Sequence, residues 1–257
     1  MGDQRVVLIS ANWKMHLNHV EALQLVQQLA GHLHASGVPA GREVSIHPPF
    51  TSIGTVQGAI EVGHVPVALG AQSCHFADAG PYTGEVSAGM LATLHVRYVI
   101  AGHSERRAQC GETDEVVRDK VDAIYRHAMH PILCVGENAE ERHRGAAEKK
   151  VRRQVAAVLG DRSAGEVAEA VVAYEPLWAI GAGEAATPDD VEEMCAAIRD
   201  ELARLAGAGA AALVRIQYEG SVTPETSPAL LGAENVEGFL VEGASLAAGQ
   251  FAAIVIG

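Results

Sequence analysis

Basic residues are scarce in this chain. Its 257 residues include 19 Lys and Arg against 32 Asp and Glu, a formal net charge of −13. A general nucleic-acid binder needs a basic surface to displace counterions from phosphates, and an anionic membrane surface makes the same demand. The composition therefore argues against both partners. A small anionic substrate remains compatible, because local backbone dipoles can oppose the global charge.

Cysteine pairs of the C-x-x-C type are absent. The four cysteines are Cys74, Cys110, Cys134 and Cys195. The segment ahead of Asn12 is too short for a secretory signal, and no apolar run approaches the length of a membrane span. We therefore expect free thiols in a reducing cytosol, and a cytoplasmic protein.

Convincing metal-site and dinucleotide-site spacings are also missing. His32 and His34 are two residues apart and do not share a helix face, whereas His16 and His19 could share one but lack an acidic or cysteine partner nearby. The Gly181-Ala182-Gly183 segment has no third glycine and no following helix to complete a dinucleotide fingerprint. From these patterns we expect no metal and no cofactor.

Eight short apolar runs recur through the chain, and most are continuous, as expected for parallel strands buried on both faces. They cover residues 6–9, 44–46, 67–69, 98–100, 132–135, 171–173, 213–216 and 239–241. Helical patterns lie between most of them. In the first, Leu23, Val26, Ala30 and Leu33 follow a helical step and predict the buried face. A second covers residues 113–128, and a third begins at Pro188 after Thr187, a good N-cap.

The repeat of strand and helix predicts a single-domain (β/α)8 barrel over residues 1–257. The strand starts are separated on average by about 33 residues, which is the length of a βα unit. An open doubly wound sheet is the alternative, but such a sheet more usually has five or six strands. A hydrophobic fraction of 48% fits a well-filled core, and no linker or low-complexity tract divides the chain.

The active site of such a barrel forms where strands end, so the residues after each run are the candidates. Lys14 follows the first run and could place a cation in the barrel mouth. His103 follows the fourth, ahead of Ser104 and Glu105, which could begin a helix; the helix dipole would then disfavour a charged ring. Glu175 follows the sixth, beneath a loop that could close over it and shield a general base from water.

The loops after the last two runs are candidates for phosphate binding. They read Glu219-Gly220-Ser221 and Glu242-Gly243-Ala244. Barrels often bind phosphate with these two loops, where small residues let backbone N–H groups converge on the anion.

Five segments, in order along nearly the whole chain, closely resemble the triosephosphate isomerase family. They are residues 12–15 (NWKM), 82–87 (YTGEVS), 102–107 (GHSERR), 131–137 (PILCVGE) and 174–181 (YEPLWAIG). The resemblance implies an aldose–ketose isomerase that interconverts glyceraldehyde 3-phosphate and dihydroxyacetone phosphate through an enediolate.

The resemblance also implies a role for each catalytic residue. Glu175 would be the base that moves the proton, and a neutral His103 would polarise the carbonyl. Lys14 would stabilise developing charge and help to hold the phosphate, Asn12 would orient the substrate, and Glu105 would be the acidic partner of the lysine. Acid–base tuning and lid closure in this family are worked examples of general principles.

Substrate binding and assembly follow from the same resemblance. Gly181 lies in the segment 176–186, which resembles the family's closing lid, and Gly220, Ser221, Glu242 and Gly243 lie in its phosphate loops. The family is usually dimeric, and residues 82–87 resemble the loop that inserts into the partner subunit.

The chain departs from the family at the phosphate rim. Glu219 and Glu242 replace the first glycine of two Gly-Gly pairs, and Ala182 and Glu184 replace a threonine and a lysine in the lid. If the two side chains turn outward, the backbone still binds phosphate. If they turn inward, phosphate binding is weaker or the substrate differs. The alternatives are therefore an isomerase of another small sugar phosphate, for example a tetrulose phosphate, or an impaired paralogue with a binding or regulatory role.

Overall fold

Eight parallel strands form a closed barrel in the order β1 to β8, with β1 paired to β8. The computed structural model describes residues 5–179 and 186–257. The strands are β1 (Val7–Asn12), β2 (Arg42–His47), β3 (Ala68–Ala71), β4 (Tyr98–Ala101), β5 (His130–Val135), β6 (Val171–Tyr174), β7 (Arg215–Glu219) and β8 (Gly238–Val241). All eight predicted strands are present, and the (β/α)8 barrel is confirmed.

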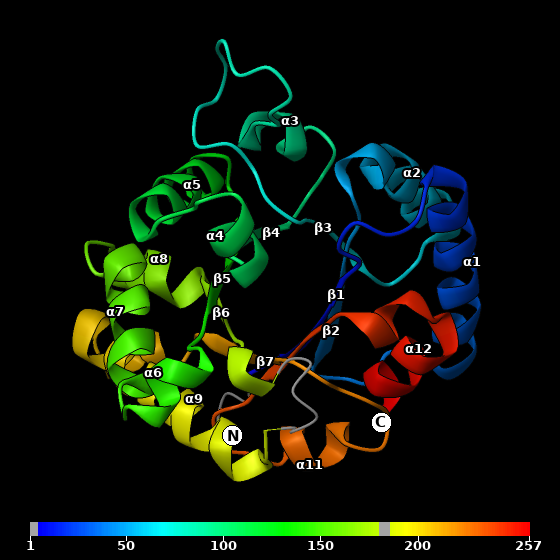
Figure 1. Ribbon diagram of the computed structural model, residues 1–257. Coiled ribbons are helices and arrows are strands. Elements are labelled where there is room, and N and C mark those ends of the chain that lie inside the picture. The colour runs from blue at the N-terminus through cyan, green and yellow to red at the C-terminus, as the bar shows by residue number, and fades with distance from the viewer. Residues whose placement is uncertain (1–4, 180–185) are drawn as a thin grey trace.

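Helices surround the barrel on its outer side (Figure 1). The α-helices are α1 (His19–Ser36), α2 (Ile53–Gly63), α3 (Ala88–Ala92), α4 (Ser104–Gln109), α5 (Asp114–Arg126), α6 (Ala139–His143), α7 (Ala147–Leu159), α8 (Ala164–Glu169), α9 (Pro188–Ala206), α10 (Ala208–Ala211), α11 (Ser227–Leu231) and α12 (Ala248–Ile256). Short 3-10 turns are η1 (Phe50–Ser52), η2 (Leu177–Ala179) and η3 (Gly243–Leu246). In the described part of the chain, no helix has the length and apolar character needed to cross a membrane.

Local sequence explains where the predicted helices begin. Thr113 caps α5 by accepting the Val116 amide hydrogen, and Thr187 caps α9 by accepting that of Asp190. The Thr187 amide in turn donates to Asp190 Oδ2, which completes a capping box. The buried stripe of α1 differs slightly from the predicted one, since Leu25 and Leu29 are buried and Leu23 lies at its edge.

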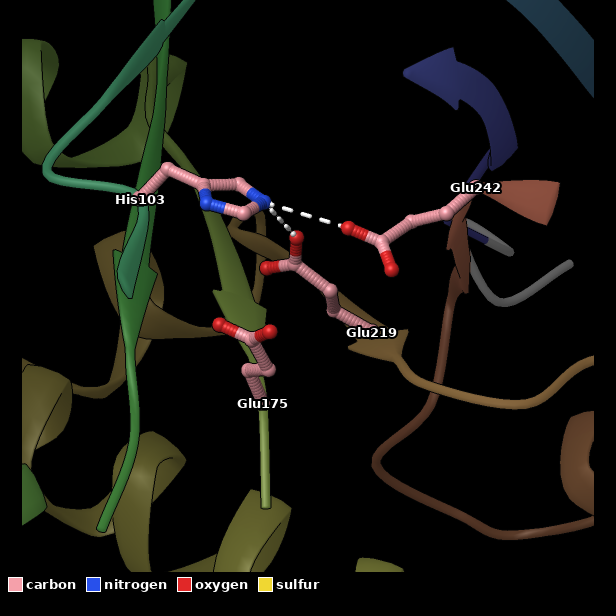
Figure 2. Close-up of side chains that lie close together, drawn as sticks. All are labelled: His103, Glu175, Glu219 and Glu242. Carbon is pink, nitrogen blue, oxygen red and sulfur yellow. Dashed lines mark hydrogen bonds and ion pairs between the residues drawn. The ribbon is translucent and has the colours of Figure 1, made fainter. Parts of the chain in front are cut away.

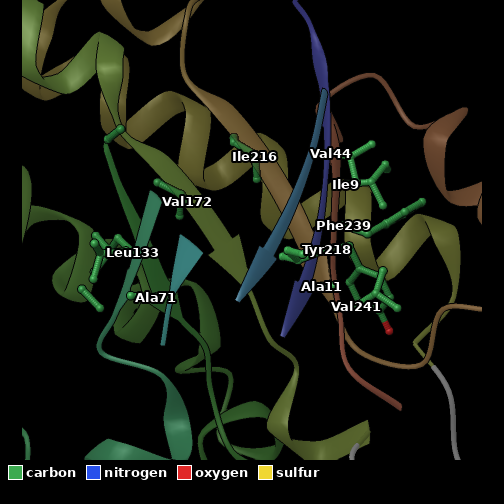
Figure 3. Packing of buried hydrophobic residues seen from close by; sticks show 14 of the residues in the cluster. Ile9, Ala11, Val44, Ala71, Leu133, Val172, Ile216, Tyr218, Phe239 and Val241 are labelled. Carbon is green, nitrogen blue, oxygen red and sulfur yellow. The ribbon is translucent and has the colours of Figure 1, made fainter. Parts of the chain in front are cut away.

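Side chains of each strand alternate between the barrel interior and the layer of helices. The outward set packs with the helices into the main hydrophobic core, and Figure 3 shows part of it around Ile9, Val172 and Phe239. The inward apolar set forms a separate cluster: Leu8, Tyr98, Ile100, Ile132, Cys134, Val171, Ala173 and Leu240. Because successive residues of a strand face opposite sides, the residue two positions beyond each inward one also points inward.

A polar layer fills the interior below the barrel mouth. Gln217 donates hydrogen bonds from Nε2 to Ser10 Oγ (2.8 Å) and to the Leu8 carbonyl (2.9 Å). Ser45 donates to the same Ser10 Oγ at 2.8 Å. These buried groups form a rigid floor, because their hydrogen bonds would be costly to break in the absence of water.

Candidate active site

The carboxyl ends of all eight strands lie at one rim, because the strands are parallel. Five of the ionisable groups that the sequence places after strands meet there: Lys14, His103, Glu175, Glu219 and Glu242. Four of them, His103 and the three glutamates, each offer a nitrogen or oxygen atom within 4.8 Å of the others. Figure 2 shows these four side chains pointing toward one another.

His103 is held at the start of a helix, as the sequence predicts. It is the N-cap residue of α4, and its Nδ1 accepts the amide hydrogen of Glu105 at 3.2 Å. Gly102 before it has φ +72°, and a Cβ there would overlap Arg107 and Val117. Glycine is therefore needed for the turn that brings the imidazole from β4 into the barrel mouth.

Glu175 lies directly after β6 and is only 2% exposed. Ala173 faces the interior, so the alternation along the strand directs Glu175 inward too. Its amide donates to the Val135 carbonyl at 2.9 Å. Burial and the neighbouring Glu219 raise the pKa of Glu175 to about 8, although His103 and Ser104 act in the opposite direction. A carboxyl group with this pKa is suited to proton transfer near neutral pH.

Lys14 is held between two carboxylates. Its Nζ lies 2.8 Å from Glu105 Oε1 and 2.6 Å from Glu242 Oε1. Burial lowers the pKa of Lys14, but the two glutamates raise it more, so the ammonium stays charged. Lys14 has a left-handed φ of 51°, and Asn12 Oδ1 accepts its amide hydrogen at 3.1 Å. Asn12 thus stabilises the strained backbone that presents the lysine.

Glu219 and Glu242 both point into the site. Glu219 is 0% exposed, and its Oε1 lies 2.8 Å from His103 Nε2. Glu242 Oε1 accepts a hydrogen bond from the same Nε2 at 3.2 Å. The hypothesis that the two carboxyl groups turn outward is therefore wrong. Neither residue has a positive φ, so their backbone is free of left-handed strain.

The charge state of His103 is subject to opposing influences. Burial lowers the pKa of His103, whereas the neighbouring carboxyl groups of Glu219, Glu242 and Glu175 raise it. The hydrogen bonds describe a neutral ring, because Nδ1 accepts the Glu105 amide hydrogen and Nε2 carries the proton directed to Glu242. The neutral ring therefore stays a prediction.

The remaining predicted binding residues lie next to this cluster. Gly220, Ser221, Glu242 and Gly243 line a cavity of about 350 Å³ beside Pro176. Asn12, Lys14, His103 and Glu105 line a second cavity of about 400 Å³. Gly181, Ala182 and Glu184 lie outside the described residues. Glu242 connects the two cavities, since it lies in the wall of the first and contacts Lys14 of the second.

Sequence reasoning did not identify two buried groups that support the site. Glu137 accepts hydrogen bonds from Tyr174 Oη (3.1 Å) and Trp178 Nε1 (2.9 Å), and so fixes the chain on both sides of Glu175. Cys134 lies beside Glu219, and burial together with the nearby glutamates raises the pKa of its thiol far above the usual value. Strand alternation could have found Cys134, because it is two residues beyond the inward-facing Ile132.

Comparisons with known proteins agree with this architecture. The sequence model of the family described as triosephosphate isomerase matches residues 7–256. A triosephosphate isomerase of Carboxydothermus hydrogenoformans is 46% identical over 254 residues, covering 98% of this chain and 99% of the relative. Those of Cutibacterium acnes and Chloroflexus aurantiacus are each 45% identical, and the matches cover 98% of this chain and 97% and 98% of the relatives.

Proposed function

The chain belongs to the triosephosphate isomerase family, and we propose that it interconverts glyceraldehyde 3-phosphate and dihydroxyacetone phosphate. The observation that carries the proposal is the convergence of Lys14, His103 and Glu175 at one barrel rim, in a chain 46% identical to a curated member over nearly its full length. Isomerisation of a triose needs a base, an electrophile and a fixed cation, and these three residues supply them.

The proposed reaction moves one proton between two adjacent carbons and a second between their oxygens. Glu175 takes the proton from the carbon beside the carbonyl, and the electron pair of the broken C–H bond forms the C=C bond of the enediolate. His103 donates a hydrogen bond through Nε2 to the oxygen that gains charge. The hydroxyl proton then passes to that oxygen as the other oxygen becomes the new carbonyl, and Glu175 returns its proton to the neighbouring carbon. No oxidant is consumed, because one carbon is oxidised as the other is reduced.

Substrate binding must displace contacts that are present in the free protein. His103 Nε2 and Lys14 Nζ both contact Glu242, and Nε2 also contacts Glu219. A substrate oxygen therefore competes with these carboxyl groups for the same donors. A carboxylate about 8 Å from a phosphate dianion costs about 1 kcal/mol at the dielectric constant of water and about 4 at an effective value of 20.

This competition is the reason to test a second candidate, an isomerase of another small sugar phosphate. A buried carboxylate accepts hydrogen bonds from hydroxyl groups, so Glu219 could select a sugar with one more hydroxyl than a triose. A coupled assay with glyceraldehyde 3-phosphate, a tetrulose phosphate and unphosphorylated glyceraldehyde separates the two. We expect the highest kcat/KM with the triose phosphate. A higher value with the tetrulose phosphate would replace the first proposal by the second.

The assay needs a variant that removes the chemistry and leaves the fold intact. Glu175→Gln keeps the size of the side chain but cannot take the proton, and general-base catalysis contributes typically 10²–10⁴-fold. We expect kcat to fall at least about 100-fold. A loss of less than about threefold would show that Glu175 is not the base. If the native protein and the variant are equally inactive on every substrate, the impaired paralogue is favoured.

We also propose a homodimer in the cytoplasm, formed through the loop of residues 82–87. This loop belongs to the long connection between β3 and α3, which projects from the barrel (Figure 1). Exposed apolar side chains support the assignment, since Tyr82 is 41% exposed and Met15, at the barrel mouth, is 93% exposed. Contact with a second copy would bury them.

A further inference from the structure

One histidine and three glutamates form a compact set of potential ligands at the barrel mouth. They come from the ends of four different strands, β4, β6, β7 and β8, and Figure 2 shows them converging on a common centre. His103, Glu175 and Glu219 are buried, and the side chain of Glu242 is 20% exposed. Such a set differs from a surface acidic cluster, because water cannot solvate most of its charges.

Glu219 is the group that most needs a partner. It is 0% exposed, and neither of its oxygens accepts a well-aligned hydrogen bond from any residue that the structure describes. His103 Nε2 is 2.8 Å from Oε1, but its N–H is directed to Glu242 instead. The neighbouring Cys134 thiol is only a weak donor. Leaving a buried carboxyl group unsatisfied costs free energy that a bound ligand would recover.

We propose that a divalent transition-metal ion binds at the centre of His103, Glu175, Glu219 and Glu242. A cation at this point lies among carboxyl groups from the ends of β6, β7 and β8 and can bind an oxygen of each. It also gives Glu219 a bond where both of its oxygens lack a hydrogen bond in the described part of the chain.

The observed geometry can contract to that of a bound site. Zinc bonds to carboxylate oxygen and imidazole nitrogen are about 2.0–2.2 Å long and the ion is usually tetrahedral, so the ligand atoms around it are about 3.3–3.6 Å apart. The four ligand atoms lie within 4.8 Å of one another. A contraction of up to about 1.5 Å, through rotation of the glutamate side chains, completes the coordination.

Coordination through Nε2 moves the ring proton to Nδ1. That atom now accepts the Glu105 amide hydrogen, and Glu105 Oε2 lies 3.7 Å from it. A small turn of the ring would let Nδ1–H donate to this carboxylate. A carboxylate behind a metal-bound histidine orients the ring and makes it a better ligand.

The ligand set indicates which ions bind best. Carboxylates accept Mg²⁺, Mn²⁺ and Zn²⁺ alike, whereas imidazole favours Zn²⁺ and other later transition metals. One nitrogen ligand among three oxygens therefore predicts affinities in the order Zn²⁺, Mn²⁺, Mg²⁺, as in the Irving–Williams series. Mg²⁺ binds weakest because it keeps its water and prefers an all-oxygen octahedron.

Metal binding goes beyond the proposed isomerase activity and does not depend on it. The ion would coordinate Glu175, which then cannot take a proton, and it would occupy the place of the substrate oxygen at His103 Nε2. We therefore expect Zn²⁺ to inhibit triose phosphate turnover and a chelator to restore it. Binding without any turnover would refute only the proposed activity, and turnover without binding would refute only the metal site.

The test is calorimetric titration of the full-length, chelator-stripped protein with ZnCl₂, MnCl₂ and MgCl₂. We expect one site with the affinity order given above, and a loss of at least about tenfold in Zn²⁺ and Mn²⁺ affinity in Glu219→Gln. This variant keeps the shape of the side chain, and its melting temperature shows that it is folded. The matched control is Glu225→Gln, the same change on an exposed glutamate of the loop after β7, with affinity expected to stay unchanged.

Three results would overturn the proposal. The first is no binding of Zn²⁺ or Mn²⁺ to the native protein at millimolar concentration. The second is binding that Glu219→Gln leaves intact, since the ion would then lie on other histidines or cysteines. The third is equal loss in Glu219→Gln and Glu225→Gln, which would indicate general attraction of cations to an acidic surface.

Discussion

At the scale of single residues, the chemistry of the barrel mouth is dominated by contacts among its own side chains. Lys14 and His103, the two groups expected to stabilise negative charge on a substrate, both contact Glu242 in the free protein. Their donor groups are thus partly occupied before a substrate arrives. An anionic substrate gains less from these groups than it would from free donors.

Replacing both inward glutamates by glycine should strengthen binding of phosphorylated substrates. We expect Glu219→Gly, Glu242→Gly to lower KM for glyceraldehyde 3-phosphate about 30-fold, because removal of about 2 kcal/mol of repulsion corresponds to that factor. Inhibition by inorganic phosphate should tighten in parallel. Added salt should weaken the repulsion from Glu242 more than from the fully buried Glu219. An unchanged KM would show that the carboxyl groups do not act on the phosphate, and loss of activity would show that they contact the substrate.

The ring of His103 should remain neutral from pH 5 to pH 8 in chelator-treated protein. Its Nδ1 accepts the Glu105 amide hydrogen, and its place at the start of α4 disfavours an imidazolium. Nδ1 should therefore show the ¹⁵N shift of an unprotonated ring nitrogen across this range. A native ring that is protonated, or that titrates near the ordinary value of about 6.5, would contradict the prediction.

At the scale of elements, the exact end of each strand decides what faces the substrate. The sequence predicts all eight strands because each is a short apolar run buried on both sides. It predicts His103 and Glu175 at strand ends for the same reason. The direction of Glu219 is harder to see, because β7 extends to Glu219 although its apolar run ends at Ile216. Gln217, two residues earlier, also points inward. This polar residue within a strand was the available indication that Glu219 faces the same way.

Other features depend on contacts between elements and could not be predicted from local pattern. The pKa of His103 follows from charges on β7 and β8, which the local sequence around β4 does not contain. Similarly, the buried stripe of α1 is set by where the helix lies on the barrel, so Leu25 and Leu29 are buried more fully than the predicted Leu23.

The contact between β5 and β6 gives a prediction at this scale. A Cβ on Gly136 would overlap the backbone carbonyl oxygen of Glu175. Gly136→Ala should therefore displace the base, and kcat should fall about 100-fold, as expected for misplacement of a catalytic group by about 1 Å. The matched control is Gly58→Ala in α2, where a Cβ meets no atom within 4 Å. It should leave kcat unchanged and stabilise the helix by about 1 kcal/mol. A folded Gly136→Ala protein with native kcat would show that the contact does not position Glu175.

At the scale of the whole molecule, the proposed dimer needs an experiment, because the structure contains one chain. Sedimentation velocity at micromolar concentration should give twice the chain mass of 26.9 kDa. Tyr82→Glu should shift the protein to monomer, because a charge in an apolar interface is costly to bury. Val62→Glu is the matched control, since Val62 is 85% exposed on α2, away from the loop. A monomeric native protein, or equal dissociation by both variants, would refute the proposed interface.

The pairing of β8 with β1 has a consequence for how the protein is made. Leu8 to Ala11 pair with Gly238 to Val241, so the earliest strand acquires its second neighbour only when the last one emerges from the ribosome. During synthesis, β1 presents unpaired N–H and C=O groups along one side, and an open strand edge is a template for association with other chains. The nascent barrel is thus most prone to aggregate shortly before its final strand is added. A ribosome stalled between β7 and β8 should hold the chain in that vulnerable state, where a chaperone would bind it best.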